Sequence, residues 1–478
     1  MEMFDVVVVG AGPCGIYLCY ELIQKRPSLK VLLLDKGKDI YHRTCPILAG
    51  KIKQCPQDIY GKSECYPSCS MTSGFGGCGA FSDGKFNITS EFGGWMGDYL
   101  PKDEVLDLIR YVDQINLKHG APTKITNPNT KEILDIERRG LAVGLKLLRS
   151  EVRHLGTEVN LKLLESIYEE LLAKGVTMKF NEEIKDIVVG KDNAIEGVID
   201  DKGNEYCGKY VVLNVGRPGS QWLSKCLRKH RIKLTNNRVD IGVRVETNDV
   251  IMSEINEKLY EGKFIYSTSV GTSVRTFCSN PSGHVVIENN NGIITANGHA
   301  YNSSDLGSNN TNFALLVSHT FTEPFKDSNE YAEDISALAN KLSNGSVIVQ
   351  RYGDLIRGRR STYKRIEEGF VTPTLKEAVP GDLGLVLPYK TMQSIIEMIQ
   401  ALDHITPGIA NAHTLLYGVE AKFYSDRVEC NNHFETKIKN LYVGGDGAGI
   451  TRGLAQAGAN GVYIARDILR KEGEDDEH

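Results

Sequence analysis

The sequence predicts an α/β fold, in which a three-layer Rossmann-like domain with a parallel sheet carries an inserted domain of mixed α+β structure. Near the start, the apolar run FDVVVV at 4–9 leads into the glycine turn GAGPCG at 10–15 and an apolar helical pattern. A second apolar run, VLLLD, follows at 31–35. Near the end, the run LYV at 441–443 leads into GGDGAG and another helical pattern. Much of 240–404 alternates instead, which is typical of strands.

The opening turn has the spacing G-x-G-x-x-G through Gly10, Gly12 and Gly15. In this context the first glycine permits a tight turn, the second allows backbone N–H groups to approach a pyrophosphate, and the third allows close helix–strand packing. The helix N-terminus adds free N–H groups and a positive dipole end. Asp35 ends the second strand, where it is placed to accept hydrogen bonds from ribose hydroxyls. The unit is therefore predicted to bind a dinucleotide.

The length of the chain and the change of pattern along it predict two domains. A chain of 478 residues is too long for one compact core. We expect a discontinuous nucleotide-binding domain over 1–239 and 405–478, and an inserted substrate domain over 240–404. The apolar helical patterns of the first domain lie near 105–115, 141–154 and 161–173.

Composition limits the classes of partner. The formal net charge of -5 gives no bulk reason to expect binding to nucleic acid or to a membrane surface. No apolar stretch is long enough for a transmembrane helix. The 11 cysteines, without an export signal before the first strand, are typical of a reducing compartment and mostly free thiols. We therefore expect a cytoplasmic protein with no nucleic-acid or membrane partner.

The two ends of the chain carry a resemblance to known proteins. VGAGPCGIYLCYEL and LYVGGDGAG resemble FAD-binding proteins of the glutathione-reductase-like superfamily. The strings GFGGCGAFSDGKF, VDIGVRVE and GDGAGITRGLAQAGANG are similar to a narrower family of FAD-dependent dehydrogenases, the NAD(P)/FAD-dependent oxidoreductases. The resemblance implies FAD as the cofactor, with its ADP half on the opening motif. It implies that Asp446 bonds near the ribityl–phosphate junction, and that the last helix points its N-terminus at the flavin ring.

The resemblance and the glycine pattern together define a set of candidate cofactor-binding residues. They are Gly10, Gly12, Pro13, Cys14, Gly15, Asp35, Lys36, Gly76, Gly77, Gly216, Gly445, Asp446, Arg452, Gly453 and Leu454. Within this set, Arg452 could add a formal positive charge beside the flavin. Gly216 belongs to NVGRPG, which departs from the small-residue turn that the superfamily usually has there.

The stretch 36–100 combines cysteines with a glycine-rich loop. The loop around 73–87 has four glycines in six residues, which predicts close backbone approach to a flat or charged group. The spacing of Cys45, Cys55, Cys65 and Cys69 matches no standard zinc ribbon or ferredoxin pattern. Three alternatives stay open: an iron–sulfur cluster, a redox-active pair, or free structural thiols. No metal ligand is assigned.

The candidate catalytic residues are Arg275, His299, Lys85 and Arg359. Arg359 belongs to LIRGRRST, whose arginines suit an anionic substrate, although a solvated basic loop fits the same pattern. His299 could donate a proton or be structural. Lys85 could bond the flavin or form an ion pair with Asp83.

The expected activity is hydride transfer between FAD and a small, anionic or unsaturated metabolite. The middle of the chain has no second G-x-G-x-x-G. Any NAD(P)H would therefore bind transiently at the flavin, or a protein electron carrier would deliver the electrons. The alternatives are an FAD-dependent tRNA-modifying enzyme, which the acidic charge disfavours, and a non-catalytic flavin-containing redox sensor.

Overall fold

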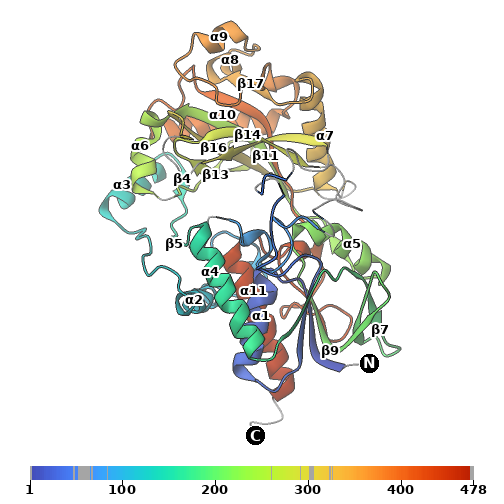
Figure 1. The fold of residues 1–478 in the computed structure, drawn as a ribbon. Helices are drawn as coiled ribbons and strands as arrows, with labels where there is room; N and C mark the ends of the chain where they lie inside the picture. The colour runs from blue at the N-terminus through green and yellow to red at the C-terminus, as the bar shows by residue number, and fades with distance from the viewer. Residues whose placement is uncertain are drawn as a thin grey trace. The chain divides into compact units, whose positions relative to one another are not determined.

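The computed structural model divides the chain into two compact units (Figure 1). Unit 1 comprises 1–126, 150–235 and 425–478, and unit 2 comprises 127–149 and 236–424. The structure describes residues 3–46, 49–51, 65, 68–82, 84–259, 261–290, 292–300, 306–321, 325 and 327–473.

Unit 1 is built on a mixed sheet, which has seven strands among the described residues. The strand order is β6-β2-β1-β9-β8-β7, and β21 also pairs with β9. The elements of unit 1 are β1 (Met3–Val9), α1 (Pro13–Lys25), β2 (Val31–Asp35), η1 (Gly77–Gly79), β3 (Lys85–Ile88), η2 (Met96–Asp98), α2 (Lys102–Lys118), β5 (Glu151–His154), α4 (Thr157–Ala173), β6 (Thr177–Phe180), β7 (Ile184–Val189), β8 (Ile195–Asp200), β9 (Glu205–Leu213), η3 (Arg217–Gly219), α5 (Ser220–Lys229), β10 (Leu234–Thr235), β20 (Arg427–Val428), β21 (Leu441–Val443), η6 (Asp446–Ala448) and α11 (Leu454–Gly473).

The strands β6, β2, β1, β9 and β21 of this sheet run parallel to their neighbours. The apolar residues 6–9 of β1 pair with 31–34 of β2 on one side and with 210–213 of β9 on the other. β21 pairs with the second half of β9, whereas β8 and β7 continue the sheet in antiparallel fashion. The loops after β1, β2, β9 and β21 therefore gather at one edge of the sheet, since the carboxyl ends of parallel strands meet there.

The helices α1 and α11, near the two ends of the chain, pack side by side (Figure 1). A Cβ at Gly461 of α11 would lie only 2.0 Å from the carbonyl oxygen of Cys14 in α1. A Cβ at Gly15 would lie 2.1 Å from the carbonyl oxygen of Gly10, so α1 also packs closely on the end of β1. Residues without a Cβ thus allow both helices to begin at the same edge of the sheet.

Unit 2 is built on a mainly antiparallel sheet, with eight strands among the residues described. The order is β18-β17-β19-β11-β16-β13-β12-β4, and the hairpin β14–β15 forms a separate sheet. The elements of unit 2 are α3 (Lys131–Leu141), β4 (Leu145–Leu147), β11 (Val239–Asn248), α6 (Asp249–Lys258), β12 (Phe264–Ser267), β13 (Ser273–Asn280), β14 (His284–Asn290), β15 (Ile293–His299), β16 (Asn310–His319), α7 (Ser328–Leu342), β17 (Ile348–Arg351), α8 (Tyr352–Ile356), α9 (Tyr363–Glu367), β18 (Val379–Pro380), η5 (Leu383–Leu385), α10 (Tyr389–Asp403) and β19 (Leu415–Lys422). The mixed α/β class expected for the chain is confirmed.

The side chains of the central strand β11 alternate between an apolar face and a polar face of the unit 2 sheet. Its residues Ile241, Val243 and Val245 belong to the apolar core that α6 and α10 help to form. The alternating residues include Asp240 and Arg244, whose side chains are fully buried on the other face. The unit therefore buries charged groups on one face of its sheet, and these groups need partners there.

The structure differs from the expectations in one helix and in two domain boundaries. A helix over 141–154 is wrong: this stretch holds a turn at Gly144, with φ of +83°, and the strands β4 and β5, which pair with β12 and β3. Ile133 and Leu145 belong to the apolar core of unit 2, so 127–149 belongs to that unit. The insertion spans 236–424 instead of 240–404, because β19 pairs with β11 and β17 in the unit 2 sheet.

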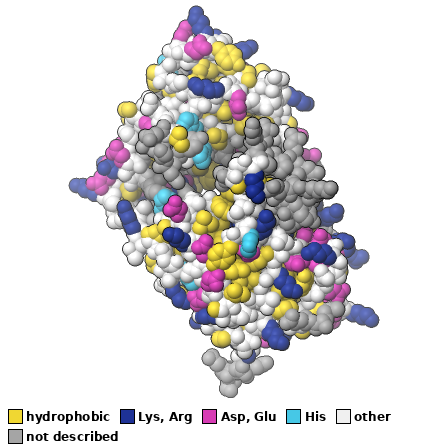
Figure 2. Space-filling view, viewed as in Figure 1, with side chains coloured by type: hydrophobic (Ala, Val, Ile, Leu, Met, Phe, Trp, Pro, Cys, Tyr) yellow, Lys and Arg dark blue, Asp and Glu magenta, His cyan; other side chains and the backbone are white. Residues whose placement is uncertain are grey.

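The surface carries charges of both signs. On the face shown in Figure 2, Lys and Arg side chains are interspersed with Asp and Glu side chains. This mixture agrees with the small formal net charge of the chain, -5. Of the helices in the described part of the chain, none combines the length and apolar character that crossing a membrane requires.

The close packing of α1 and α11 makes a testable prediction about stability. Gly461→Ala would drive its Cβ into backbone atoms of α1, whereas a Cβ at Gly458 would meet the Tyr17 and Val112 side chains at 2.9 and 3.0 Å. Backbone atoms cannot move aside as side chains can. We expect Gly461→Ala to lower the free energy of unfolding by about 1–3 kcal/mol, and Gly458→Ala by less. Urea unfolding of both variants checks this, and equal stability of Gly461→Ala and the wild type would contradict it.

Candidate functional site

The glycine turn after β1 is fixed by Asp35, the last residue of β2. Asp35 Oδ2 accepts a hydrogen bond from the Ala11 backbone N–H at 2.8 Å, and Oδ1 accepts one from Gly37 N–H at 2.7 Å. Gly10 has a φ of +110°, so the turn needs a residue without a Cβ. Each carboxylate oxygen retains a lone pair. Asp35 could therefore bond a ribose hydroxyl while it holds the turn.

The N-terminus of α1 has open space beside Gly12. No side chain caps the helix, and a Cβ added at Gly12 would meet no atom within 4 Å. This space and the first-turn N–H groups fit a pyrophosphate. The Cys14 side chain points elsewhere, because its Sγ lies 3.6 Å from Asn460 Oδ1 of α11. Burial raises the pKa of the Cys14 thiol to about 12, so a phosphate would meet only the backbone N–H of this residue.

The buried guanidinium of Arg43 holds the glycine-rich loop in place. It donates to the carbonyl oxygens of Ser70 at 2.9 Å, Phe75 at 2.5 Å and Gly77 at 2.8 Å. Burial lowers the pKa of Arg43 to about 10, despite the favourable charge of Asp35 nearby. One guanidinium thus donates to three carbonyl groups in the loop and just before it. The loop is therefore held by a side chain that belongs to no sequence motif.

The loop contacts the N-terminal ends of both α1 and α11. A Cβ at Gly77 would lie 3.3 Å from Gly12 Cα, just before α1. A Cβ at Gly79 would lie 2.5 Å from Leu454 Cδ2, in the first turn of α11. In addition, the Gly76 N–H donates to the Ala11 carbonyl oxygen at 2.8 Å. The loop therefore lies close to both helix ends, and Gly77, with a φ of +57°, has a backbone conformation that favours glycine.

The loop after β21 is tied to the loops after β9 and before η2. Thr451 Oγ1 donates to Asp446 Oδ1 at 2.6 Å, which orients this carboxylate. Gly447 N–H donates to the Val215 carbonyl oxygen at 2.9 Å, and Arg452 N–H donates to the Gly93 carbonyl oxygen at 2.9 Å. The segment between β21 and α11 is thus fixed by backbone bonds on both sides.

The structure places the candidate cofactor residues on the segments that gather at this edge of the sheet. They are Gly10, Gly12, Pro13, Cys14 and Gly15 after β1, Asp35 and Lys36 at the end of β2, Gly76 and Gly77 on the glycine-rich loop, Gly216 after β9, and Gly445, Asp446, Arg452, Gly453 and Leu454 after β21. Sequence reasoning missed the residues that orient them, above all Arg43 and Thr451. Arg43 lies in no recognisable spacing, and Thr451, although it lies within the closing string, gave no signal of its own, so contacts in the folded chain are needed to find them.

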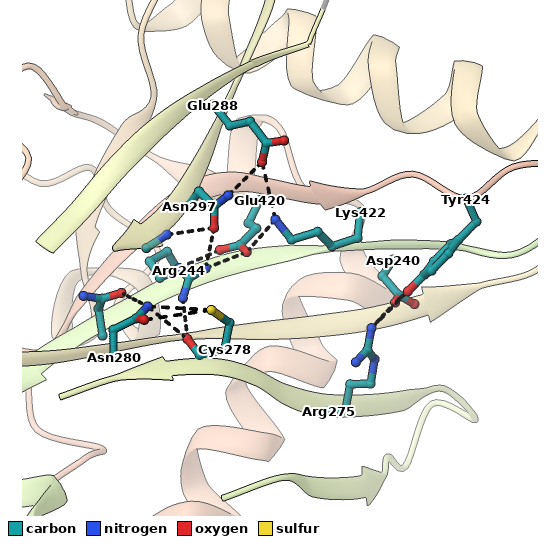
Figure 3. A network of polar contacts seen from close by, with 12 residues as sticks. Asp240, Arg244, Arg275, Cys278, Asn280, Glu288, Asn297, Glu420, Lys422 and Tyr424 are labelled. Atoms are coloured by element: carbon teal, nitrogen blue, oxygen red, sulfur yellow. Dashed lines mark hydrogen bonds and ion pairs between the residues drawn. The ribbon is translucent and has the colours of Figure 1, made fainter. Parts of the chain in front are cut away.

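In unit 2, the candidate Arg275 lies beside a buried carboxylate (Figure 3). Its Nη2 lies 2.6 Å from Asp240 Oδ2 and 3.0 Å from the Tyr424 hydroxyl. Burial by itself raises the pKa of Asp240, but the Arg275 charge and hydrogen bonds from Arg275, Ser318 and Tyr424 outweigh it and lower the pKa to about 2. About a quarter of the Arg275 side chain is exposed, at 23%. Asp240 therefore holds the Arg275 guanidinium in a defined position.

A second charged group lies along the same polar face (Figure 3). Arg244 and Glu420 are both fully buried, and Arg244 Nε and Nη2 lie 2.8 Å from Glu420 Oε2 and Oε1 respectively. Lys422 Nζ lies 3.2 Å from Glu420 Oε1 and 3.7 Å from Glu288 Oε2. Asn297 bridges this group, because its Oδ1 accepts from Arg244 and its Nδ2 donates to Glu288. The charges of Arg244, Glu420, Lys422 and Glu288 thus neutralise each other.

The four candidate catalytic residues do not form a single cluster within either unit. Lys85 lies on β3 of unit 1. In unit 2, Arg359 lies 2.7 Å from Asp354 Oδ1, in an ion pair separate from that of Arg275. His299 is exposed at the end of β15, opposite His284 of β14.

The cysteine group is only partly described. Cys45, Cys65 and Cys69 lie within the described residues, whereas Cys55 and Asp83 lie outside them. Within the described part of the chain, the groups of potential metal ligands consist of one set, which contains none of these cysteines. The iron–sulfur, redox-pair and free-thiol interpretations of the four cysteines all stay predictions.

The low pKa of Asp240 predicts how stability depends on pH. A lowered pKa contributes stability above the ordinary value of 3.8, and this contribution is lost as the pH falls towards about 2. Asp240→Asn should therefore be less stable than the wild type at neutral pH and lose less stability across that acid interval. Urea midpoints measured at several pH values check this. Asp334→Asn, at an exposed position of α7 in the same unit, is the control, and identical acid profiles for Asp240→Asn and the wild type would contradict the prediction.

Comparison with known proteins adds a family and several distant likenesses. Residues 238–423, which cover most of unit 2, match the family described as FAD-dependent protein, C-terminal domain-like. A relative from Clostridium beijerinckii (strain ATCC 51743 / NCIMB 8052), an uncharacterized protein, is 26% identical over 97% of this chain and 80% of its own length.

Among solved structures, glycine oxidase from Bacillus cereus ATCC 14579 has a TM-score of 0.35 and 14% identity, covering 98% of this chain and 95% of its own. An R554K variant of Aspergillus oryzae RIB40 formate oxidase has a TM-score of 0.45 and 12% identity, covering 99% of both chains. These likenesses are too distant to carry an argument. The family match over residues 238–423 is to FAD-dependent proteins, and it supports FAD as the cofactor of this chain.

Proposed function

We propose that FAD lies along the carboxyl edge of the parallel sheet of unit 1. The observation that carries this proposal is the glycine-rich loop, whose Gly77 and Gly79 approach the N-terminal ends of α1 and α11. The first of these helix ends suits a pyrophosphate, and the second suits the negative charge that a reduced flavin ring carries. One extended ligand would thus meet both helix ends, with the loop packed against it.

Each segment of this edge has its own task in the proposal. The first-turn N–H groups of α1 bind the pyrophosphate, and Asp35 accepts a hydrogen bond from the adenosine ribose. Asp446, oriented by Thr451, accepts from a hydroxyl of the ribityl chain. Lys36, Gly216 and Arg452 line the same edge, and the glycines leave room for the flat parts of the ligand.

The proposed reaction is a hydride transfer between the flavin and a small, anionic or unsaturated metabolite. Bound FAD supplies the two-electron acceptor and donor. Arg275, held by Asp240, offers a fixed guanidinium to a carboxylate or phosphate of the substrate. His299, Lys85 and Arg359 are the further candidates for moving a proton or binding the substrate. NAD(P)H at the flavin, or a protein electron carrier, is the proposed second redox partner.

Absorption spectra and rapid reduction test this function. We expect the purified protein to show the bands of an oxidised flavin, and anaerobic mixing with NADH or NADPH to bleach them in a stopped-flow instrument. Small carboxylates and their unsaturated analogues are then screened for reoxidation of the reduced protein. A colourless protein that does not take up FAD would contradict the proposal, and bound FAD that no donor or metabolite turns over would favour a redox sensor.

The role of Arg43 predicts a specific effect on cofactor affinity. Arg43→Lys keeps the charge but cannot donate to three separate carbonyl groups of the loop in the same planar arrangement. We expect it to raise the Kd for FAD about tenfold or more, which corresponds to about 1.4 kcal/mol. Fluorescence titration of the FAD-depleted protein measures this.

The matched control for this experiment is Arg110→Lys. Arg110 lies on α2, where its side chain is 56% exposed and 3.9 Å from Asp107. This change should leave the Kd for FAD unchanged, because a surface ion pair contributes little. Equal Kd values for Arg43→Lys and Arg110→Lys would show that the loop does not depend on the guanidinium.

A further inference from the structure

A group of three potential metal ligands lies between β7 and α5 of unit 1, on residues to which the proposed function gives no role. Asp186 comes from β7, while Cys226 comes from α5 and His230 follows its last residue. The spacing of four residues puts the thiol and the imidazole on the same side of the helix. Asp186 faces them from the strand, so an oxygen, a sulfur and a nitrogen donor lie close together.

The distances between the donor atoms are close to those around a tetrahedral metal ion. His230 Nε2 lies 2.9 Å from Asp186 Oδ1, and Cys226 Sγ lies 3.4 Å from the same oxygen. All three donor atoms lie within 4.8 Å of one another. Zinc bonded tetrahedrally to sulfur, nitrogen and oxygen keeps these atoms about 3.3–3.6 Å apart. The two distances to Asp186 Oδ1 thus lie within about half an ångström of the tetrahedral values.

The surroundings of Asp186 support a ligand role for its carboxylate. The Ile187 backbone N–H donates to Oδ1 at 2.9 Å, and the Lys229 ammonium forms an ion pair with Oδ2. Second partners of this kind orient a ligating carboxylate and are typical of metal sites. One thiolate and one carboxylate would neutralise a divalent ion, and Lys229 would stay at the outer oxygen.

The same group is poorly suited to thiol chemistry. Burial, followed by the nearby Asp186 charge, raises the pKa of the Cys226 thiol to about 12. A nucleophilic or redox-active cysteine needs a lowered pKa and exposure, and Cys226 is only 5% exposed. A metal ion removes this obstacle, because it binds the thiolate directly and displaces the proton.

We propose that Asp186, Cys226 and His230 bind one Zn²⁺ ion, with a water molecule as the fourth ligand. Binding breaks the S–H bond of Cys226, forms a zinc–sulfur bond and releases the proton to solvent. The His230 proton moves from Nε2 to Nδ1, so that the Nε2 lone pair reaches the ion. A mixed sulfur, nitrogen and oxygen set with a solvent-accessible side suits zinc better than magnesium or calcium. The ion would join α5 to β7, and this holds whether or not the proposed flavin site is correct.

Zinc titration of the chelator-treated full chain tests the site. We expect one Zn²⁺ per chain, measured by competition with a chromophoric chelator, and about one proton released per ion near neutral pH. Cys226→Ser and His230→Gln should each raise the Kd for zinc by about tenfold to a hundredfold. Cys207→Ser, on β9 of the same sheet and outside the group, should bind zinc like the wild type.

Folding controls keep the outcomes distinct. Circular dichroism of each variant shows whether it is folded, and His230→Gln preserves side-chain volume in case Cys226→Ser unfolds. Folded variants that lose zinc while Cys207→Ser keeps it support the site. Zinc affinity of the wild type no greater than that of Cys226→Ser and His230→Gln, or binding without proton release, would overturn the proposal.

Discussion

The close contact between α1 and α11 is the constraint on which the arrangement of unit 1 depends. It joins segments more than 400 residues apart in a chain of 478, and it requires a glycine on α11 because the Cys14 carbonyl oxygen occupies the place of a side chain. Through it, the loops after β1 and β21 meet at one edge, and the glycine-rich loop packs against both. A Cβ at Gly461 would push apart the two helix ends that form the proposed cofactor site.

Unit 2 buries charged side chains on one face of its sheet. Arg244 and Glu420 lie on the same face of the sheet with no exposure, where an unpaired charge would be strongly destabilising. Their mutual pairing, extended by Lys422 and Asn297, compensates these two charges and gives them a defined arrangement. Against this neutralised background, Arg275 is a charged group of the face that reaches solvent while a buried carboxylate holds it. In the proposed function, this fixed position lets Arg275 bind an anionic substrate.

The sequence allowed prediction of the elements whose signals are local. The strand–turn–helix at Gly10–Gly15, the strand ending at Asp35 and the closing motif around Asp446 were all expected where the structure has them. The segment 141–154 was misassigned as a helix, because its apolar spacing fits a helix while its partners, β12 and β3, lie far away in the chain. Arg43 escaped notice for the same reason, since its three carbonyl partners are 27 to 34 residues away.

The sequence by itself determined the α/β class of the fold and the strand–turn–helix at Gly10–Gly15, because glycine spacing, strand alternation and the acid after the second strand reflect rules that act over a few residues. Only the tertiary structure decided that 127–149 belongs with unit 2, that Asp240 holds Arg275, and that Asp186 meets Cys226 and His230. These relations join residues distant in the chain, and they arise from the packing of whole elements. No local pattern encodes which side chains will face each other once strands and helices are assembled.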